Sequence, residues 1–190
     1  VYQVGGAAID YEDLAIGPGP DSGVDYLYIA DIGNNNSTRA TRTVYRVREP
    51  NVAWNQAYVT ASLTSVEPLP FTFPAGRNDN AEALFVDPDT QDIYVVTKNG
   101  FTRPNALYVM TAPHTPAVSR TLTYLGDVYA GDGNDIAITA ADISSDGSRI
   151  MLRALHAANH WDRSPGMSIA DTILTTTPCS AEVGPTETKG

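Results

Sequence analysis

Acidic side chains recur along the chain at intervals of about 60 to 70 residues, each at the head of a short apolar run. Two asparagines add neutral amide oxygens near these positions. Carboxylate and amide oxygens gathered at one point form the ligand set that Ca²⁺ prefers. The pattern therefore predicts a candidate calcium site. Its residues are Glu12, Asp13, Asn34, Asn80, Glu82 and Asp142.

The same acids have two other interpretations. They could accept hydrogen bonds from backbone N–H groups of a neighbouring sheet, or act in general acid/base catalysis, because like charges held close together raise one another's pKa. Glu12 aligns with Glu82 in the repeat, whereas Asp142 aligns with Asp13, one position later. Alternate residues of a strand face opposite sides. Not all of these acids therefore need to meet.

A second set of polar residues lies at the ends of the longer apolar runs. It consists of Asp31, Lys98 and Arg153. Opposite charges at equivalent places in adjacent units could form a belt of surface ion pairs, which contribute little each. They could equally line a polar pocket for an anionic or sugar ligand. Both interpretations remain open at the level of sequence.

Other reactive side chains are few. His156 and His160 have the spacing of a zinc pair on a helix, but no third ligand is obvious. Cys179 is the only cysteine, so it is either a buried apolar group or the partner of a cysteine outside this chain. Nucleophile elbows, phosphate-binding glycine loops and Cys-x-x-Cys pairs are missing. The sequence therefore indicates no catalytic residue and favours a non-enzymatic role.

The sequence predicts that the elements that position these residues are β-strands. Short runs of Val, Ile, Leu, Tyr and Thr are bounded by Gly, Pro, Asn or Asp, and helical periodicity is nearly absent. The predicted strands are Leu14–Gly17, Tyr26–Asp31, Thr43–Val47, Val66–Phe73, Ala83–Asp87, Ile93–Lys98, Ala106–Thr111, Thr121–Val128, Ala141–Ser144 and Arg149–Leu155.

These strands repeat in units of about 65 residues with four strands each, which is typical of β-propeller blades. A β-sandwich is the alternative, but it gives no reason for an acid at the head of every fourth strand. We therefore predict an all-β chain, a single propeller-like region over 1–190, with blade units at roughly 10–75, 78–130 and 135–190.

About three blades are too few for a closed ring, which takes at least four. Val1–Val4 is expected to be the outer strand of a blade that began earlier. We expect missing chain segments or other copies of the chain to complete the propeller. Blades of several copies could also pair edge to edge into a filament.

The composition of the chain indicates which classes of partner it can bind. Twelve basic and 22 acidic side chains give a net charge of −10, which disfavours nucleic acid and anionic membrane surfaces. No apolar run approaches the roughly 20 residues of a membrane span. Two overlapping sequons at Asn35 and Asn36 are candidate glycosylation sites in an exposed loop. These features favour a secreted, extracellular protein.

Several short motifs together resemble a known family. They are Tyr11-Glu12-Asp13-Leu14-Ala15, Asp31-Ile32-Gly33-Asn34-Asn35, Val44-Tyr45-Arg46-Val47, Asn80-Ala81-Glu82-Ala83-Leu84 and Asp142-Ile143-Ser144-Ser145-Asp146-Gly147. In order and spacing the chain resembles a largely uncharacterised family of secreted, propeller-like proteins of bacteria and algae. That family is distantly akin to TolB- and NHL-type six-bladed propellers. The resemblance implies a fold more than a reaction, and it adds calcium-dependent lactonases and phytases as distant analogues.

Two functions follow as expectations. The first is a secreted β-propeller module with a structural or binding role, as part of a larger assembly. The alternative is a Ca²⁺-dependent hydrolase of the lactonase or phosphoesterase kind, in which Glu12, Glu82 and Asp142 hold the metal.

Overall fold

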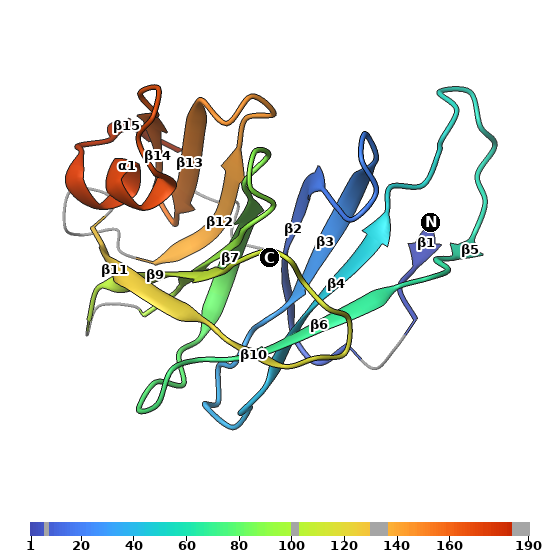
Figure 1. The fold of residues 1–190 in the computed structure, drawn as a ribbon, viewed down its shortest axis with the longest axis horizontal. Helices are drawn as coiled ribbons and strands as arrows, with labels where there is room; N and C mark the ends of the chain where they lie inside the picture. The colour runs from blue at the N-terminus through green and yellow to red at the C-terminus, as the bar shows by residue number, and fades with distance from the viewer. Residues whose placement is uncertain (6–7, 100–102, 130–136, 184–190) are drawn as a thin grey trace, which may run out of the picture.

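The computed structural model describes residues 1–5, 8–99, 103–129 and 137–183, and Figure 1 shows their arrangement. Strands dominate this part of the chain, which confirms the all-β prediction. They form three large sheets and one small sheet, and none of these sheets closes on itself within the described residues. In those residues no helix is long and apolar enough to cross a membrane.

The first sheet has the spatial order β10-β6-β4-β3-β2. Neighbouring strands are antiparallel except for β10 and β6, which are parallel. Its strands are β2 (Tyr11–Pro18), β3 (Asp25–Asp31), β4 (Arg42–Arg48), β6 (Glu67–Thr72) and β10 (Arg120–Thr121).

The second and third sheets are antiparallel, with the orders β11-β9-β8-β7 and β12-β13-β14-β15. The second contains β7 (Ala81–Val86), β8 (Ile93–Thr97), β9 (Asn105–Met110) and β11 (Thr123–Val128). The third contains β12 (Ile138–Ile143), β13 (Arg149–Ala154), β14 (Ala157–Asp162) and β15 (Cys179–Glu182).

Each large sheet begins, in chain order, with the strand that lies nearest the other sheets. These inner strands are β2, β7 and β12, and they pack against one another in the middle of the molecule (Figure 1). Residues at the head of these three strands are therefore brought close together, although they are far apart in the sequence.

Two apolar layers hold the sheets together. The layer between the first and second sheets includes Tyr28, Phe71 and Tyr108, and the layer between the second and third sheets includes Phe85 and Trp161. Burying one such aromatic side chain contributes on the order of 2 kcal/mol or more. Three of the four strands of the second sheet are buried on both faces, since every residue of β7, β8 and β9 is buried.

Two short elements lie outside the predicted pattern. The helix α1 (Ile169–Thr175) precedes β15 and packs on β11 and β14. It begins at Ser168, whose hydroxyl accepts a hydrogen bond from the Asp171 backbone N–H, as an N-cap residue does. Strand β10 crosses from the second-sheet segment to the edge of the first sheet, where it links the two sheets.

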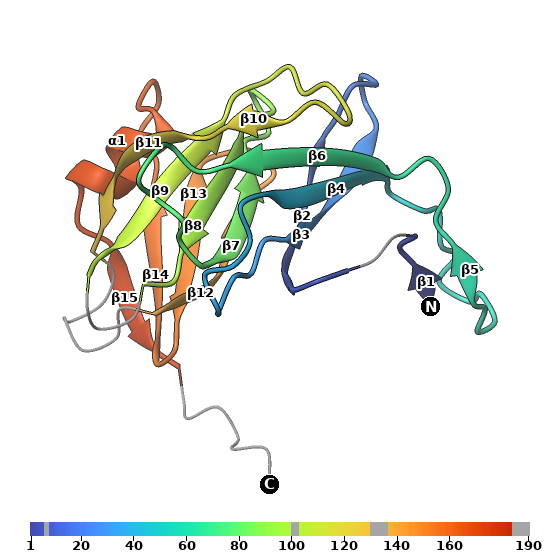
Figure 2. The same ribbon diagram turned by 90° about the horizontal axis from the view of Figure 1, so that it is seen from below.

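The amino-terminal segment differs from expectation. Strand β1 (Tyr2–Gln3) pairs in parallel with β5 (Ala61–Ser62) in the small sheet, so this strand is bound to a later segment of the same chain. Figure 2 shows this small sheet projecting beyond β4 and β6 of the first sheet.

Candidate functional site at the inner strands

Each inner strand carries a β-bulge near its start. The pairing of β2 with β3 skips Glu12, that of β7 with β8 skips Glu82, and that of β12 with β13 skips Thr139. A bulge redirects the side chain of its extra residue and is common next to functional sites. Thr139 is therefore the third-sheet counterpart of the two glutamates. Asp142 lies further along β12 and is exposed.

The Asp13 carboxylate connects all three sheets. Its Oδ2 accepts hydrogen bonds from the backbone N–H of Leu84 in β7, at 2.9 Å, and of Ala141 in β12, at 3.2 Å. Its Oδ1 accepts another from Leu14, at 2.9 Å. Burial raises the pKa of Asp13, and these three bonds offset part of the rise. This geometry corresponds to the hydrogen-bonding interpretation of the repeated acids.

Glu82 is buried and occupied by an ion pair. Both of its carboxylate oxygens accept from Lys98 Nζ, at 2.8 and 2.7 Å, and Oε1 also accepts from Asn80 Nδ2, at 3.2 Å. Only 6% of Glu82 is exposed. A buried carboxylate of this kind is stable as a charge only with such a partner.

Glu12 lies beside this ion pair, and the pKa of its carboxyl is unusually high. Burial, the negative charge of Glu82, and the charge and hydrogen bond of Asp10 together raise the pKa of Glu12 to about 7, and Lys98 opposes the rise. We call Asp10, Glu12, Glu82 and Lys98 the inner cluster. A carboxyl with a pKa near neutrality can both hold and release a proton at physiological pH.

A close backbone approach borders the inner cluster at Gly33. A Cβ at this position would collide with side-chain oxygens of Asp10 and Glu12. A side chain at position 33 would therefore displace the two acids. Glycine here permits the chain after β3 to pass directly over the inner cluster.

The two predicted amide ligands are engaged in holding this region together. Asn80 Oδ1 accepts from the backbone N–H of Asn34 at 2.6 Å, and Asn34 Oδ1 accepts from the backbone N–H of Arg39 at 2.9 Å. The Asn80 amide, together with Asn34 Nδ2, which donates to the Asn78 carbonyl at 3.4 Å, thus joins the segment after β3 to the segment before β7.

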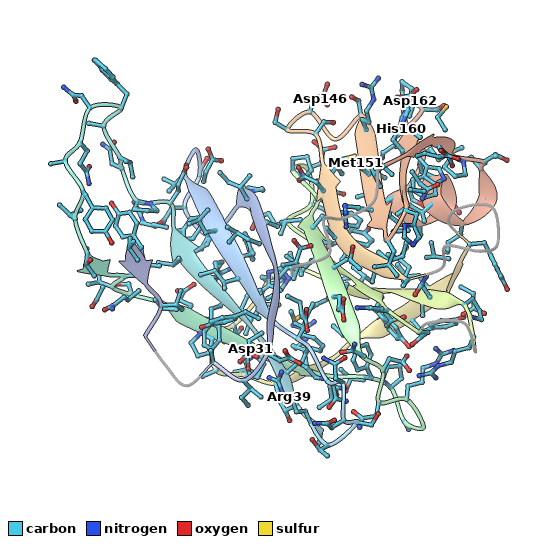
Figure 3. The ribbon with its side chains drawn as sticks, turned by 180° about the vertical axis from the view of Figure 1, so that it is seen from behind. Asp31, Arg39, Asp146, Met151, His160 and Asp162 are labelled. Atoms are coloured by element: carbon cyan, nitrogen blue, oxygen red, sulfur yellow. The ribbon has the colours of Figure 1, made fainter. Side chains whose placement is uncertain are left out.

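The second polar set is not gathered into one pocket by any contact among its three members. Asp31 is buried and pairs with Arg39, at 3.0 Å, and the two lie together in Figure 3. Lys98 binds Glu82, and Arg153 Nη1 donates to Thr139 Oγ1 at 3.1 Å. Lys98 and Arg153 thus each bind a residue near the start of their own sheet, whereas Asp31 binds a residue of the loop that follows β3. The ligand-pocket assignment stays a prediction.

The six predicted calcium ligands are divided between different places. Glu12 and Glu82 belong to the inner cluster, Asn80 contacts Glu82, and Asn34 contacts Asn80. Asp13 lies where the three inner strands meet, and Asp142 is exposed further along β12. Across the part of the chain that the structure describes, no group of three or more His, Cys, Asp or Glu side chains is arranged to hold a metal ion. Calcium binding stays a prediction.

The structure also shows where the remaining residues singled out in the sequence lie. Asn35 and Asn36 are exposed in the turn after β3, where a glycan has room. His160 lies in β14 and His156 in the bend before it, so the helical spacing of a zinc pair is not present. Cys179 is exposed at the start of β15 rather than buried.

Sequence reasoning missed Asp10, Arg39 and Thr139. Asp10 precedes the repeated motif by one residue, and Arg39 lies in a polar loop, so no apolar pattern draws attention to them. A signal did exist for Thr139, because it precedes an alanine pair as Glu82 precedes Ala83. It becomes visible only once the bulge defines the alignment.

No protein-family model matches the chain, and no curated protein matches it significantly in sequence.

Proposed function

We propose that this protein is a secreted β-propeller module with a structural or binding role, and that the outer face of its first sheet binds a second copy of the chain. Three features support the propeller interpretation. Each large sheet begins with its inner strand, the three inner strands pack together, and each carries a bulge at the same place. The family resemblance in sequence agrees with this arrangement.

The observation that carries the binding role is the apolar outer face of the first sheet, which points away from the second sheet. We define this face by the paired residues Tyr11, Leu14, Ile16, Leu27, Ile29 and Tyr45. Leu14 is 58% exposed and Ile16 is 49% exposed. A hollow of about 480 Å³, with a largely apolar lining, lies between this face and the small sheet.

Exposed apolar side chains are concentrated in the first third of the sequence, which contains the strands of this face. Of the 13 large apolar side chains that are exposed among the described residues, nine lie between residues 1 and 59. They include Trp54 and Tyr58, on the segment between β4 and β5. An exposed apolar patch of this kind marks a protein–protein interface more often than a free surface.

A second copy is favoured as the partner because the outer face of the third sheet is charged and does not match the apolar first-sheet face. The outer face of the third sheet is defined by Asp142, Arg149, Met151, Arg153, His160 and Asp162. If two copies closed a ring, the apolar face of one would cover these charges on the other. Desolvating them would cost several kcal/mol per ion without adequate pairing. Two apolar first-sheet faces related by a two-fold axis are self-complementary.

Sedimentation equilibrium of the full chain tests this proposal. We expect a dimer that dissociates at least about a hundredfold more readily when Ile16→Asp places a charge in the interface. Met151→Asp is the matched control, since it puts the same charge on the outer face of the third sheet, and it should leave the dimer intact. A wild-type monomer, or equal effects of the two variants, would overturn the proposal.

The alternative function, a Ca²⁺-dependent hydrolase, is favoured by one observation. Glu12, with its pKa of about 7, could act as a general base at the end of the inner strands. Hydrolysis of lactones and phosphomonoesters, measured with and without Ca²⁺, tests it. Activity that requires Ca²⁺ and is lost in Glu12→Gln would support the hydrolase. Unchanged activity in that variant would remove it.

The extracellular location is part of the same proposal and depends on the two exposed asparagines. An intact mass above that of the bare chain, reduced by Asn36→Gln or Asn35→Gln, would support it. Expression in a secreting eukaryotic cell that leaves both asparagines unmodified would count against glycosylation.

A further inference from the structure

Three sulfur and nitrogen donors lie side by side on the outer face of the third sheet. Met151 of β13 pairs directly with His160 of β14, and His160 pairs directly with Cys179 of β15. Directly paired residues of antiparallel strands point to the same face, with Cβ atoms about 4.5–5.5 Å apart. The thioether, imidazole and thiol therefore form one row across three strands, and Figure 3 labels Met151 and His160 in it.

We propose that this row, Met151, His160 and Cys179, binds a single Cu(I) ion. Thiolate and thioether sulfur are soft donors that select Cu(I), and imidazole nitrogen also suits copper. Harder cations are less suited to this set, because two of its three donors are sulfur. His160 occupies the middle of the row, so an ion bound to one of its ring nitrogens would lie between the strands that carry the two sulfur donors.

The surroundings keep the row accessible. Cys179 is exposed, and Met151 is 45% exposed. A hollow of about 250 Å³ borders Met151 and His160 and is lined also by Asp142. The inner faces of β13 and β14 are filled by Ile150, Leu152 and Trp161, which fix the backbone that carries Met151 and His160. Strand β15, which carries Cys179, is held by its pairing with β14.

The nearby charges permit a cation. Arg149 is held by Asp162, with 2.9 Å between Nε and Oδ1, and Arg153 is bonded to Thr139. Asp142 pairs with Met151 on the same face and brings a negative charge to that end of the row. Binding forms a sulfur–copper bond at Cys179 and releases the thiol proton to solvent, with no change in oxidation state.

This proposal does not depend on the proposed function, because it concerns the sheet face that the proposed dimer leaves in contact with water. The two therefore fail separately. Loss of dimerisation leaves the copper row unchanged, and loss of copper binding leaves the first-sheet face unchanged.

An anaerobic competition experiment tests the site on the reduced full chain. Cu(I) is offered as its complex with bicinchoninate, and loss of the complex's absorbance reports transfer to the protein. We expect one Cu(I) per chain in the wild type and none in Cys179→Ser. Met151→Leu and His160→Gln should each weaken binding by at least about tenfold, because each removes a direct ligand.

Met167→Leu is the matched control, since this methionine lies outside the row, and it should bind as the wild type does. Circular dichroism verifies that each variant is folded. The proposal is overturned if the wild type takes no Cu(I) from bicinchoninate, or if either Met151→Leu or His160→Gln binds Cu(I) as tightly as the wild type. In the second case the exposed thiol alone would hold the ion.

X-ray absorption at the copper edge gives an independent measurement. We expect a mixed shell of sulfur and nitrogen scatterers, and Met151→Leu should lower the sulfur contribution. A shell of sulfur alone would contradict the proposal, since it would place copper between thiols of two chains.

Discussion

The outer faces of the first and third sheets are built alike and yet differ sharply in chemistry. Both lie on antiparallel strands whose inner faces are buried in an apolar layer. On the first sheet, the residues that alternate with the buried ones are Leu, Ile and Tyr, whereas on the third they are mostly charged or polar. Successive residues of a strand point to opposite faces, so every second residue of these strands points outward. The types of these outward residues decide which outer face can remain in contact with water.

The two outer faces are suited to different roles. The first-sheet face is suited to burial against another apolar sheet, and the third-sheet face is suited to solvent and to small ligands. The second sheet lies between them, and its strands β7, β8 and β9 are buried on both sides.

The largest expected effect separates the inner face of a sheet from its outer face. Trp161→Ala removes a fully buried ring from the third sheet, together with its hydrogen bond to the Thr176 carbonyl. It should lower the free energy of unfolding by about 3–5 kcal/mol in urea denaturation. Met151→Ala, on the outer face of the same sheet, should cost less than about 1 kcal/mol. Equal costs would mean that the outer face is also buried.

A smaller loss is expected at the strand junction that both ends share. Asp13→Ala removes the acceptor of three backbone N–H groups and should cost about 2–3 kcal/mol. Asp142→Ala, at the exposed carboxylate of β12, should change the free energy of unfolding by less than about 0.5 kcal/mol. Similar effects of the two variants in the same urea experiment would show that Asp13 does not link the sheets.

The pH dependence of stability should also distinguish the first sheet from the third. Folding raises the pKa of Glu12 from 4.5 to about 7, so the folded protein holds this proton more tightly than the unfolded chain. Stability from this group is therefore highest below about pH 4.5, falls between pH 4.5 and 7, and is lost above pH 7.

Glu12→Gln should flatten that fall, measured as the difference in unfolding free energy between pH 5 and pH 8, by on the order of 1 kcal/mol after solvent screening. Thr139→Ala, at the equivalent bulge of the third sheet, carries no titratable group and should keep the wild-type profile. A flattened profile in Thr139→Ala, or none in Glu12→Gln, would disprove this assignment.

The smallest effect is expected at the surface ion pair of the third sheet. Arg149 and Asp162 are both mostly exposed, so water and salt screen their attraction. Asp162→Asn should change the free energy of unfolding by less than about 0.5 kcal/mol. A larger loss would indicate that this face is covered, as the first-sheet face is proposed to be.

Much of the fold could be predicted from the sequence, because strand propensity and turn residues are local signals. Each of the ten predicted runs overlaps a strand. Strand β14, with the sequence Ala-Ala-Asn-His-Trp-Asp, was not predicted since only its tryptophan favours a strand. The helix α1 has seven residues, three of which are buried. It is too short to give a periodic hydrophobic signal in the sequence.

Less of the candidate site could be predicted, because its geometry depends on non-local contacts. The recurrence of acids located the inner strands, and Glu12 and Glu82 do lie near each other. The bulges could not be read from the sequence, so Asp142 was aligned with Asp13 although Thr139 is the residue at the bulge. The Lys98–Glu82 ion pair joins residues 16 positions apart, and only the pairing of β7 with β8 brings them together.

Disulfide cross-linking tests the central claim most directly, since it asks which face of the chain meets a second copy. In a Cys179→Ser background, Leu14→Cys and Met151→Cys each introduce one thiol at an exposed position, on the first-sheet and third-sheet faces respectively. Under mild oxidation at low protein concentration, Leu14→Cys should form a covalent dimer rapidly and Met151→Cys should remain monomeric. Equal rates for the two variants, or faster dimerisation of Met151→Cys, would contradict the assignment of the first-sheet face as the interface.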